Sequence, residues 1–186
     1  MAWIRTIPHE EATDDLLEIY DEIIRKRGKL SNIMRIQSLN PKVMRSHMAL
    51  YLDILFGKSD IRRADRELIA TVVSMQNDCS YCTRHHAEAL QHYWKDEWRI
   101  EKLLARDFDG ADLTDVQRSM VTYAESLTIR PTNVDAGAID ELRDAGLNDK
   151  AILDLNLIVA YFNFVNRIAE GLGVTFDENE VGGYNY

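Results

Sequence analysis

The amino-acid sequence predicts an all-α protein, and three observations support this fold class. Apolar residues recur three and four positions apart through most of the 186 residues, which is the spacing of a helix face. Glycines such as Gly28, Gly57 and Gly146 follow several of these segments, at the position where a helix commonly ends. No stretch alternates apolar and polar residues for long enough to require a strand.

Three helices are expected in the first third of the chain. Acidic residues crowd the first turns of a segment from about Glu10 to Gly28 and basic residues end it, so its charges complement the helix dipole. A short helical segment follows around Ile33 to Ser38. Asn40-Pro41 reads as an N-cap followed by proline at the first helical position, and opens a helix to about Phe56. His47 lies on its apolar face, where we expect a hydrogen-bonded core residue.

The next helix, from about Arg62 to Gln76, is apolar around most of its circumference and is expected to be buried. Glu67 stands inside this run. A buried carboxylate is costly unless it has a charged or hydrogen-bonding partner. The alternative is a surface glutamate paired with Arg63 or Arg66.

Helices are also expected toward the C-terminus. One covers about Trp94 to Arg106, and the capping box Thr114 to Gln117 opens another that runs to about Ile129. A shorter one covers about Asp135 to Ala145. The last, Lys150 to Glu170, is apolar nearly all round, which indicates that it is central to the domain or shared with another subunit.

Chain length and net charge limit the classes of protein to which this sequence can belong. Residues 1–186 are expected to form a single domain, because no linker-like stretch divides them. The net charge of −9 argues against nucleic acid or an anionic membrane as a partner. The N-terminus does not read as a secretory signal, and we expect a soluble, cytoplasmic protein. The tail from Asp177 to Tyr186 is expected to be loosely ordered or to form an arm on a neighbour.

The segment from Cys79 to His86 contains both cysteines and two of the five histidines of the chain. Asn77 and Asp78 are suitable N-caps for a helix that continues to about Lys95, so both thiols are expected in or beside its first turn. The backbone N–H groups there favour a thiolate over a thiol. At spacings of three and four, Cys79, Cys82 and His86 share one helix face, and His86 is within reach to exchange a proton with Cys82.

Three kinds of site compete for these side chains. A thioredoxin-like oxidoreductase also uses Cys-x-x-Cys, but its fold needs strands that this chain does not offer. A closed zinc site needs four ligands, so Cys79, Cys82 and a histidine would require a fourth from Glu67 or His47. The third possibility is a dithiol that cycles through a disulfide. We favour redox chemistry of this kind.

The combined spacing of these residues resembles a known family. Glu67, eleven residues, then Cys79-x-x-Cys82-x-x-x-His86 is similar to the core motif of the alkylhydroperoxidase D (AhpD)-like proteins, in the carboxymuconolactone decarboxylase superfamily. The motif segment spans residues 62–90, and the stretch 166–174 also resembles the peroxidase-related branch. The resemblance implies an AhpD-like multi-helix bundle whose subunits pack into a homo-trimer or homo-hexamer.

The resemblance also implies a function. It is that of a thiol-dependent peroxidase of the alkyl hydroperoxide reductase type, which reduces organic hydroperoxides in antioxidant defence. Cys82 would be the peroxidatic thiolate, Cys79 would resolve its sulfenic acid into a disulfide, and Glu67 with His86 would relay protons. A dithiol reductant, in related proteins a lipoyl-bearing partner, would restore the thiols. No metal, flavin or haem cofactor is expected.

Two positions depart from the family pattern or add to it. Tyr81 occupies the place of a histidine that precedes the second cysteine in the best-known member, and a phenol is a poorer proton carrier near neutral pH. Adjacent helical residues point about 100° apart, so His85 is expected at the surface or an interface, outside the site of His86.

Other interpretations of the motif remain. They are a carboxymuconolactone decarboxylase-like enzyme, which does not depend on a cysteine pair, and a non-enzymatic redox-responsive or zinc-binding module. Residues expected to line an access channel are Tyr51, Phe56, Tyr161 and Phe164.

Overall fold

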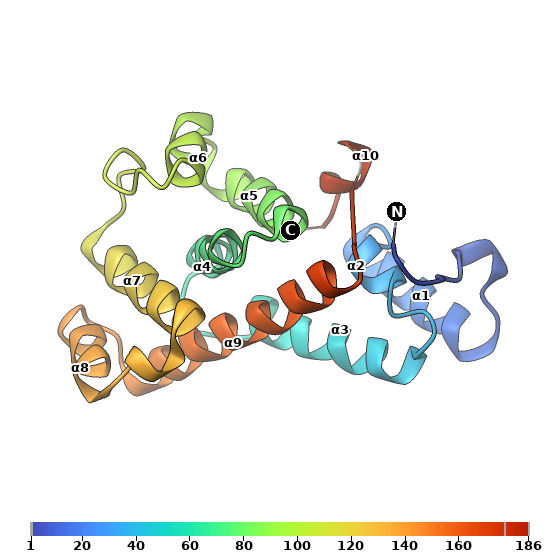
Figure 1. The fold of residues 1–186 in the computed structure, drawn as a ribbon, viewed down its shortest axis with the longest axis horizontal. Helices are drawn as coiled ribbons and strands as arrows, with labels where there is room; N and C mark the ends of the chain where they lie inside the picture. Colours follow the sequence, from blue (N-terminus) through green and yellow to red (C-terminus); the bar gives the residue numbers. More distant parts are fainter. Residues whose placement is uncertain (1, 177, 186) are drawn as a thin grey trace.

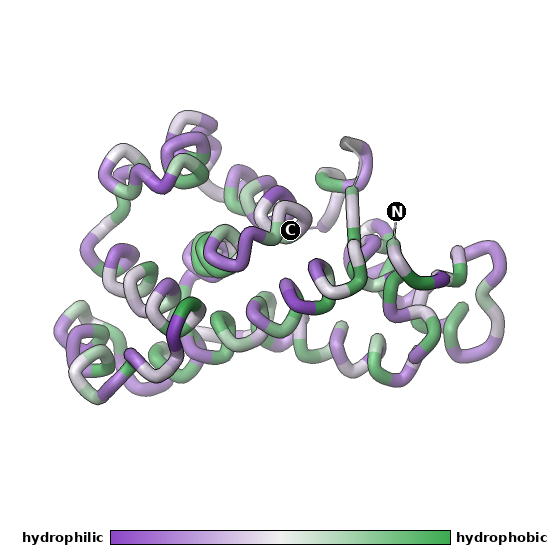
Figure 2. Tube along the Cα trace, in the orientation of Figure 1, coloured by the Kyte–Doolittle hydropathy of each residue, from purple (hydrophilic) through white to green (hydrophobic). Residues whose placement is uncertain are grey.

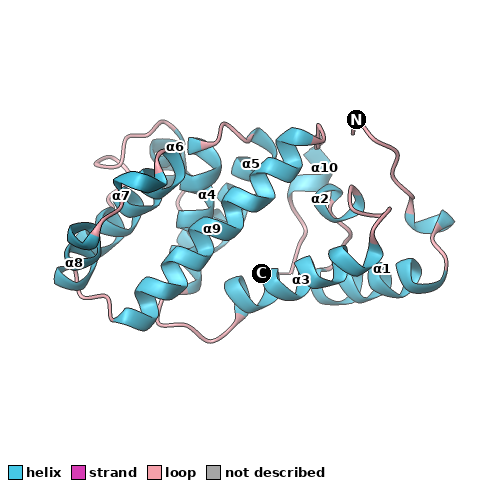
Figure 3. Ribbon diagram, turned by 60° about the horizontal axis from the view of Figure 1, so that its bottom comes forward, coloured by secondary structure: helices cyan, strands magenta, loops and turns pink. Residues whose placement is uncertain are grey.

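In the computed structural model, which describes residues 2–176 and 178–185, helices joined by loops account for the whole architecture and no strand occurs in that part of the chain (Figure 3). The all-α prediction is therefore confirmed. The helices in chain order are α1 (Asp14–Arg27), α2 (Asn32–Arg35), α3 (Pro41–Phe56), α4 (Arg63–Gln76), α5 (Ser80–Trp94), α6 (Glu97–Leu104), α7 (Asp115–Ile129), α8 (Ala136–Asp144), α9 (Asp149–Gly171) and α10 (Glu178–Val181).

Helix α4 lies at the centre of the molecule, as its sequence predicts. Every residue from Asp65 to Met75 is buried. It packs against α5, α7 and α9, and Figure 2 shows apolar residues along this central helix. The element that carries Glu67 is therefore surrounded by other helices, and any polar side chain on it must find a partner inside the protein.

Helix α9 runs diagonally across the bundle and contacts α3, α4 and α7 (Figure 1). Its N-cap, Asn148, accepts a hydrogen bond from the backbone N–H of Ala151. By length and composition α9 is apolar enough to cross a membrane, but half of its most apolar window is buried inside this fold. Burial of that kind is expected of a core helix in a water-soluble bundle.

A second, smaller core joins α1 to α2 and α3. Tyr20 and Met44 have no exposed surface at its centre. The phenol of Tyr20 donates to the carbonyl of Ile7 at 2.8 Å, which ties the N-terminal segment to α1. This core brings the C-terminal end of α1 beside α3.

Two helix starts differ from the prediction. A short 3-10 turn at His9–Glu11 precedes α1, which begins only after Thr13. The N-cap of α5 is Cys79, because Asn77 and Asp78 belong to the turn that precedes it. The amide of Asn77 donates back to the carbonyl of Val73 at 3.1 Å, and Asp78 takes a left-handed conformation, with φ of 51°, that turns the chain from α4 into α5.

The C-terminal tail does not behave as predicted. Residues 178–185 fold back over α5 and the α1–α2 connection of their own chain, and α10 forms within them (Figure 1). The backbone N–H of Asn185 donates to the carbonyl of Arg27 at 2.9 Å. Paired polar groups of this kind hold the tail in place, although its composition predicts a loose segment. Asp177 and Tyr186 lie outside the described residues.

Candidate active site

The turn between α4 and α5 brings a carboxylate and an imidazole together. Only three residues separate these helices, so they pack against each other along their length. Glu67 from the second turn of α4 then meets His86 from the second turn of α5, with Oε2 of Glu67 2.6 Å from Nδ1 of His86. The other oxygen, Oε1, lies 2.5 Å from Nη2 of Arg63, one helical turn earlier.

Glu67 is a buried, doubly paired carboxylate, with a side chain only 1% exposed. Burial raises its pKa, but the charges and hydrogen bonds of His86 and Arg63 outweigh that effect and hold the pKa below its ordinary value. The alternative of a surface glutamate is therefore wrong. Arg66 is not its partner, because its guanidinium donates to the carbonyls of Ile61 and Leu55.

Both cysteines are buried free thiols, Cys79 at the N-cap of α5 and Cys82 in its first turn. They do not lie at disulfide distance. The hydrogen bond that the Cys82 thiol donates to Cys79, burial and the charge of Cys79 raise the pKa of Cys82 well above its ordinary value. The sequence-based expectation of a thiolate is thus reversed in this state, because burial and the neighbouring sulfur outweigh the helix N-terminus.

Asn166, from α9, is a site residue that the motif analysis missed. Its side chain is 1% exposed, and its hydrogen bond to Cys82 lowers the pKa of that thiol against the larger opposing effects. Its Nδ2 donates to Ser74 at 3.1 Å, while its Oδ1 accepts from Asn77 at 2.9 Å. Nothing in local spacing connects it to the cysteines, which lie more than eighty positions earlier.

A cavity of about 80 Å³ reaches Glu67, Cys82 and His86. It is lined by Ile23, Arg27, Lys29, Ser31, Ile33, Met34, His47, Met48, Tyr51, Glu67, Tyr81, Cys82, His85, His86, Ala89, Tyr161, Phe162, Val165 and Tyr184. Of the four residues predicted to line a channel, Tyr51 and Tyr161 do so. Phe164 and Phe56 do not: they are 45% and 38% exposed, and the ring of Phe56 lies 5.8 Å from that of Tyr51.

His47 is confirmed as a hydrogen-bonded core residue that also lines this cavity. Its Nε2 lies 2.7 Å from the hydroxyl of Tyr161, and its Nδ1 lies beside the amide of Gln37. Burial lowers the pKa of His47 to about 4, so the ring is neutral near pH 7.

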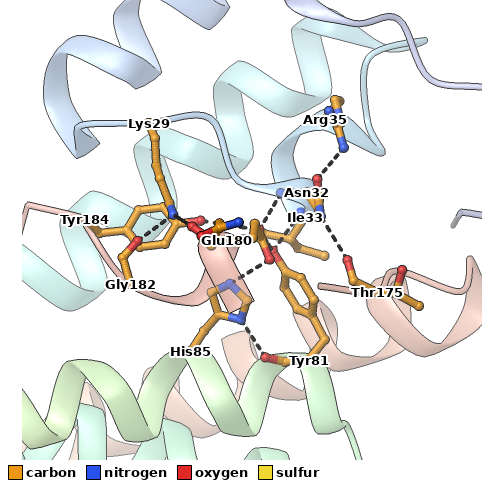
Figure 4. A network of polar contacts seen from close by, with 11 residues as sticks. Lys29, Asn32, Ile33, Arg35, Tyr81, His85, Thr175, Glu180, Gly182 and Tyr184 are labelled. Atoms are coloured by element: carbon orange, nitrogen blue, oxygen red, sulfur yellow. Dashed lines mark hydrogen bonds and ion pairs between the residues drawn. The ribbon is translucent and has the colours of Figure 1, made fainter. Parts of the chain in front are cut away.

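The prediction for His85 is wrong, because the tail covers it. The His85 side chain is only 11% exposed, and its ring stacks on that of Tyr81 with centroids 4.2 Å apart. Nδ1 of His85 lies 2.7 Å from the carbonyl oxygen of Tyr81, and Nε2 lies 3.0 Å from Oε2 of Glu180 in α10 (Figure 4). His85 and His86 therefore reach the same cavity, each beside a buried glutamate.

Glu180 is the centre of the contacts that hold the tail (Figure 4). Its Oε1 accepts from the hydroxyl of Tyr81 at 2.7 Å and from the backbone N–H of Asn32 at 2.9 Å. Burial raises the pKa of Glu180, but His85, Asn32 and Tyr81 together bring it below its ordinary value. Burial also raises the pKa of Tyr81 well above its ordinary value, so this phenol is a bound, neutral donor.

Residues 2–176 and 178–185 contain no set of side chains arranged as metal ligands. No group of three or more His, Cys, Asp or Glu side chains is arranged there to hold an ion. His47 and Glu67, the two candidate fourth ligands, are engaged with Tyr161 and with Arg63 and His86. The zinc alternative therefore gains no support from the geometry.

Comparison with known proteins agrees with the fold and the motif. A sequence model of the carboxymuconolactone decarboxylase family matches residues 41–105, which contain Glu67, Cys79, Cys82 and His86. No curated protein gives a significant match. An uncharacterized peroxidase-related protein from Silicibacter sp. TM1040 has a similar crystal structure, with a TM-score of 0.82 and 26% sequence identity over 97% of this chain and 91% of that one.

Two further solved structures share the fold. The AhpD-core, peroxidase-related protein from Ralstonia eutropha JMP134 gives a TM-score of 0.87 at 22% identity, over 97% of this chain and 94% of that one. The debrominase Bmp8 gives 0.78 at 19% identity, over 94% and 92%. The fold and the motif thus define an AhpD-like helical protein. Residues 41–105 are similar in sequence to the carboxymuconolactone decarboxylase family.

Proposed function

We propose that this protein is a cytoplasmic thiol peroxidase that reduces organic hydroperoxides through a Cys79–Cys82 dithiol/disulfide cycle, in antioxidant defence. The observation that carries the proposal is the cavity in which Cys82 and the buried Glu67–His86 pair meet. Relatives in the superfamily are enzymes, and two neighbours of the same fold are peroxidase-related. The cycle needs no metal, flavin or haem.

The proposed chemistry has three steps. The sulfur of Cys82 attacks the terminal oxygen of the hydroperoxide, so that the O–O bond breaks, an alcohol leaves and Cys82 becomes a sulfenic acid. The thiol of Cys79 then displaces water and forms the disulfide. A dithiol reductant, such as a lipoyl-bearing protein, returns both cysteines to thiols and leaves as a disulfide.

Glu67 and His86 supply the proton transfer that the first step requires. Because the pKa of Cys82 is raised, its proton must be removed by a base as the sulfur attacks. The carboxylate of Glu67 holds Nδ1–H of His86, which leaves Nε2 as the nitrogen that accepts this proton. The same imidazolium can then protonate the departing alkoxide.

Tyr81 does not take part in this proposal. Its hydroxyl donates to Glu180 and accepts from the backbone N–H of Ile33, so it is committed to the tail. We therefore assign the proton relay to Glu67 and His86 alone.

A second candidate function is reductive dehalogenation of a small aromatic ring. A variant of the debrominase Bmp8 has been solved in complex with 2,3,4-tribromopyrrole, and in our chain the rings of Tyr51, Tyr161 and Phe162 line the cavity beside Cys82. In that reaction two thiols and an aryl bromide would give a disulfide, the debrominated ring and HBr. The dithiol is again the reductant, but the substrate differs.

The deciding experiment counts free thiols before and after one equivalent of tert-butyl hydroperoxide. It uses the wild type, Cys79→Ser and Cys82→Ser, with mass spectrometry to locate the products. We expect the wild type to lose both thiols to a disulfide and Cys79→Ser to trap a sulfenic acid on Cys82. Cys82→Ser should react only at the slow rate of a buried thiol.

Other results would select the alternatives. Thiols that survive the hydroperoxide but are oxidised by 2,3,4-tribromopyrrole, with release of bromide, would favour dehalogenation. Oxidation without turnover in the presence of dihydrolipoamide would favour a non-enzymatic redox module. Activity on a carboxymuconolactone that persists in both serine variants would identify a decarboxylase.

A further inference from the structure

One end of the cavity carries two cations. Arg27 is the last residue of α1, and Lys29 follows the left-handed Gly28 that caps this helix with φ of 86°. Both side chains line the cavity that contains Cys82. Arg27 is only 7% exposed, an unusual degree of burial for a guanidinium.

The polar partners of these cations in the described part of the chain are neutral. Nη2 of Arg27 donates to the hydroxyl of Tyr51 at 3.3 Å, and Nη1 donates to the carbonyl of Asn185. These contacts use two of the five N–H groups of the guanidinium. Nζ of Lys29 donates to the carbonyl of Asn179 at 2.7 Å. It also donates to the carbonyl of Gly182 at 2.5 Å (Figure 4).

Aromatic rings surround the same two charges without neutralising them. The guanidinium carbon of Arg27 lies 4.6 Å from the ring centre of Phe56 and 5.5 Å from that of Tyr51. Nζ of Lys29 lies 4.6 Å from the ring centre of Tyr184. The quadrupoles of these rings stabilise a cation, but each ring is uncharged.

The acids near the cavity are already paired elsewhere. Glu67 is bound by Arg63 and His86. Glu180 is bound by His85 and by three N–H or O–H donors. In a chain with net charge of −9, the Arg27 end of the cavity is therefore locally positive. A positive, partly desolvated pocket favours an anion more strongly than the same charges would in water.

We propose that the cavity selects a substrate that carries a carboxylate or similar anionic group, which Arg27 and Lys29 bind. The apolar body of the substrate contacts Met34, Met48 and Val165, and its reacting group is directed to Cys82. If the proposed function holds, the substrate is a compact organic hydroperoxide with an anionic group. The anion site itself does not depend on that function.

The binding test uses benzoate and benzamide, which have nearly the same shape but differ by one charge. Calorimetry on the wild type is expected to show benzoate binding at least about tenfold more tightly than benzamide, with the preference falling as salt is added. Arg27→Gln and Lys29→Gln are each expected to reduce this preference to about twofold or less. The matched control is Lys26→Gln, which removes a charge from the exposed side of the same helix.

Arg27 also holds the tail, so its loss could act through folding. Arg27→Lys keeps the charge and is expected to keep most of the preference, and thermal unfolding of each variant reports its stability. Equal affinity of the two probes for the wild type would overturn the proposal, as would failure of benzoate to bind. So would a preference that survives in both glutamine variants.

A kinetic test separates this inference from the proposed function. A carboxylate-bearing alkyl hydroperoxide and its methyl ester are compared as oxidants of Cys82. A faster reaction of the acid, lost in Lys29→Gln, supports the anion site, and equal rates contradict it while leaving the peroxidase intact. Tight benzoate binding with no reaction of either hydroperoxide would instead contradict the proposed peroxidase function and support the anion site.

Discussion

Glu67 lies almost fully buried between Arg63 and His86, and its lowered pKa means that it stays a carboxylate at neutral pH. A negative charge at Oε2 holds the Nδ1–H tautomer of His86 and stabilises the imidazolium that forms when the ring takes a proton. Removing the charge while keeping the shape of the side chain is therefore the sharpest test of the proposed relay.

Glu67→Gln is expected to slow the reaction of Cys82 with tert-butyl hydroperoxide by about 10² to 10⁴-fold, the usual contribution of a positioned acid–base group. Stopped-flow tryptophan fluorescence or quenched mass spectrometry measures the rate. The matched control is Asp65→Asn, also a buried carboxylate on α4, which binds Arg62 and Gln117 away from the cavity.

Asp65→Asn is expected to lower the free energy of unfolding by about 1 to 3 kcal/mol and to leave the thiol reaction near the wild-type rate. If the two variants lose the reaction equally, the effect of Glu67 is structural and the relay is wrong.

At the scale of elements, the C-terminal segment 178–185 contributes Tyr184 to the wall of the cavity and is held in place by a few polar contacts. Glu180 is lodged between His85, Tyr81 and the backbone of α2, and Lys29 holds two carbonyls of the same segment. The tail buries Val181 but has no long apolar face. Its attachment should therefore depend on charge, and so on pH, more than on apolar packing.

The direction of the pH effect follows from the pKa of Glu180, which is below its ordinary value of 4.5 in the folded protein. The folded state binds fewer protons than the unfolded state in that range, so this group stabilises the tail above about pH 4.5. That contribution is lost as the pH falls through the folded pKa. His85, Tyr81 and Tyr184 are the other titratable groups near it.

Hydrogen exchange of the amides in residues 178–185 is expected to accelerate as the pH falls below about 4.5, beyond the intrinsic change. Glu180→Gln should exchange rapidly already at pH 7 and lose the acid-dependent step. Asp140→Asn, at an exposed ion pair on α8, provides the control. Unchanged protection in Glu180→Gln would show that the tail is held by other contacts.

At the scale of the whole molecule, α9 presents one apolar stripe to solvent. Leu153, Leu157 and Phe164 are 57%, 42% and 45% exposed, and their spacing of four and eleven places them on one side of the helix. The inner side of α9 is buried in the core. We propose that this stripe is part of the contact between copies in a homo-trimer or homo-hexamer.

Sedimentation velocity of the wild type is expected to show an assembly of three or six chains, and Leu157→Glu is expected to shift it toward smaller species by placing a charge in the contact. Trp98→Glu, at a 62% exposed residue of α6, is the control. A monomeric wild type, or an assembly that both variants leave intact, would contradict this use of α9.

The helices and most of the candidate site follow from local sequence. Capping residues and apolar spacing act within one or two turns, so the capping box at Thr114 and Gln117, the proline start of α3 and the long α9 are confirmed. The spacing of Glu67, Cys82 and His86 places them on neighbouring helices joined by a short turn, and the structure brings them to one cavity.

Contacts between distant segments could only be decided by the tertiary structure. Arg27 lines the cavity, Asn166 contacts Cys82 and Glu180 contacts Tyr81, and each comes from a part of the chain that no local period connects to Cys82. The pKa of Cys82 is likewise set by burial and by Cys79, which a sequence does not quantify. Local propensities specify which segments are helices. How those helices pack determines which side chains are excluded from solvent and which groups they contact, and this packing decided the charge and the walls of the site.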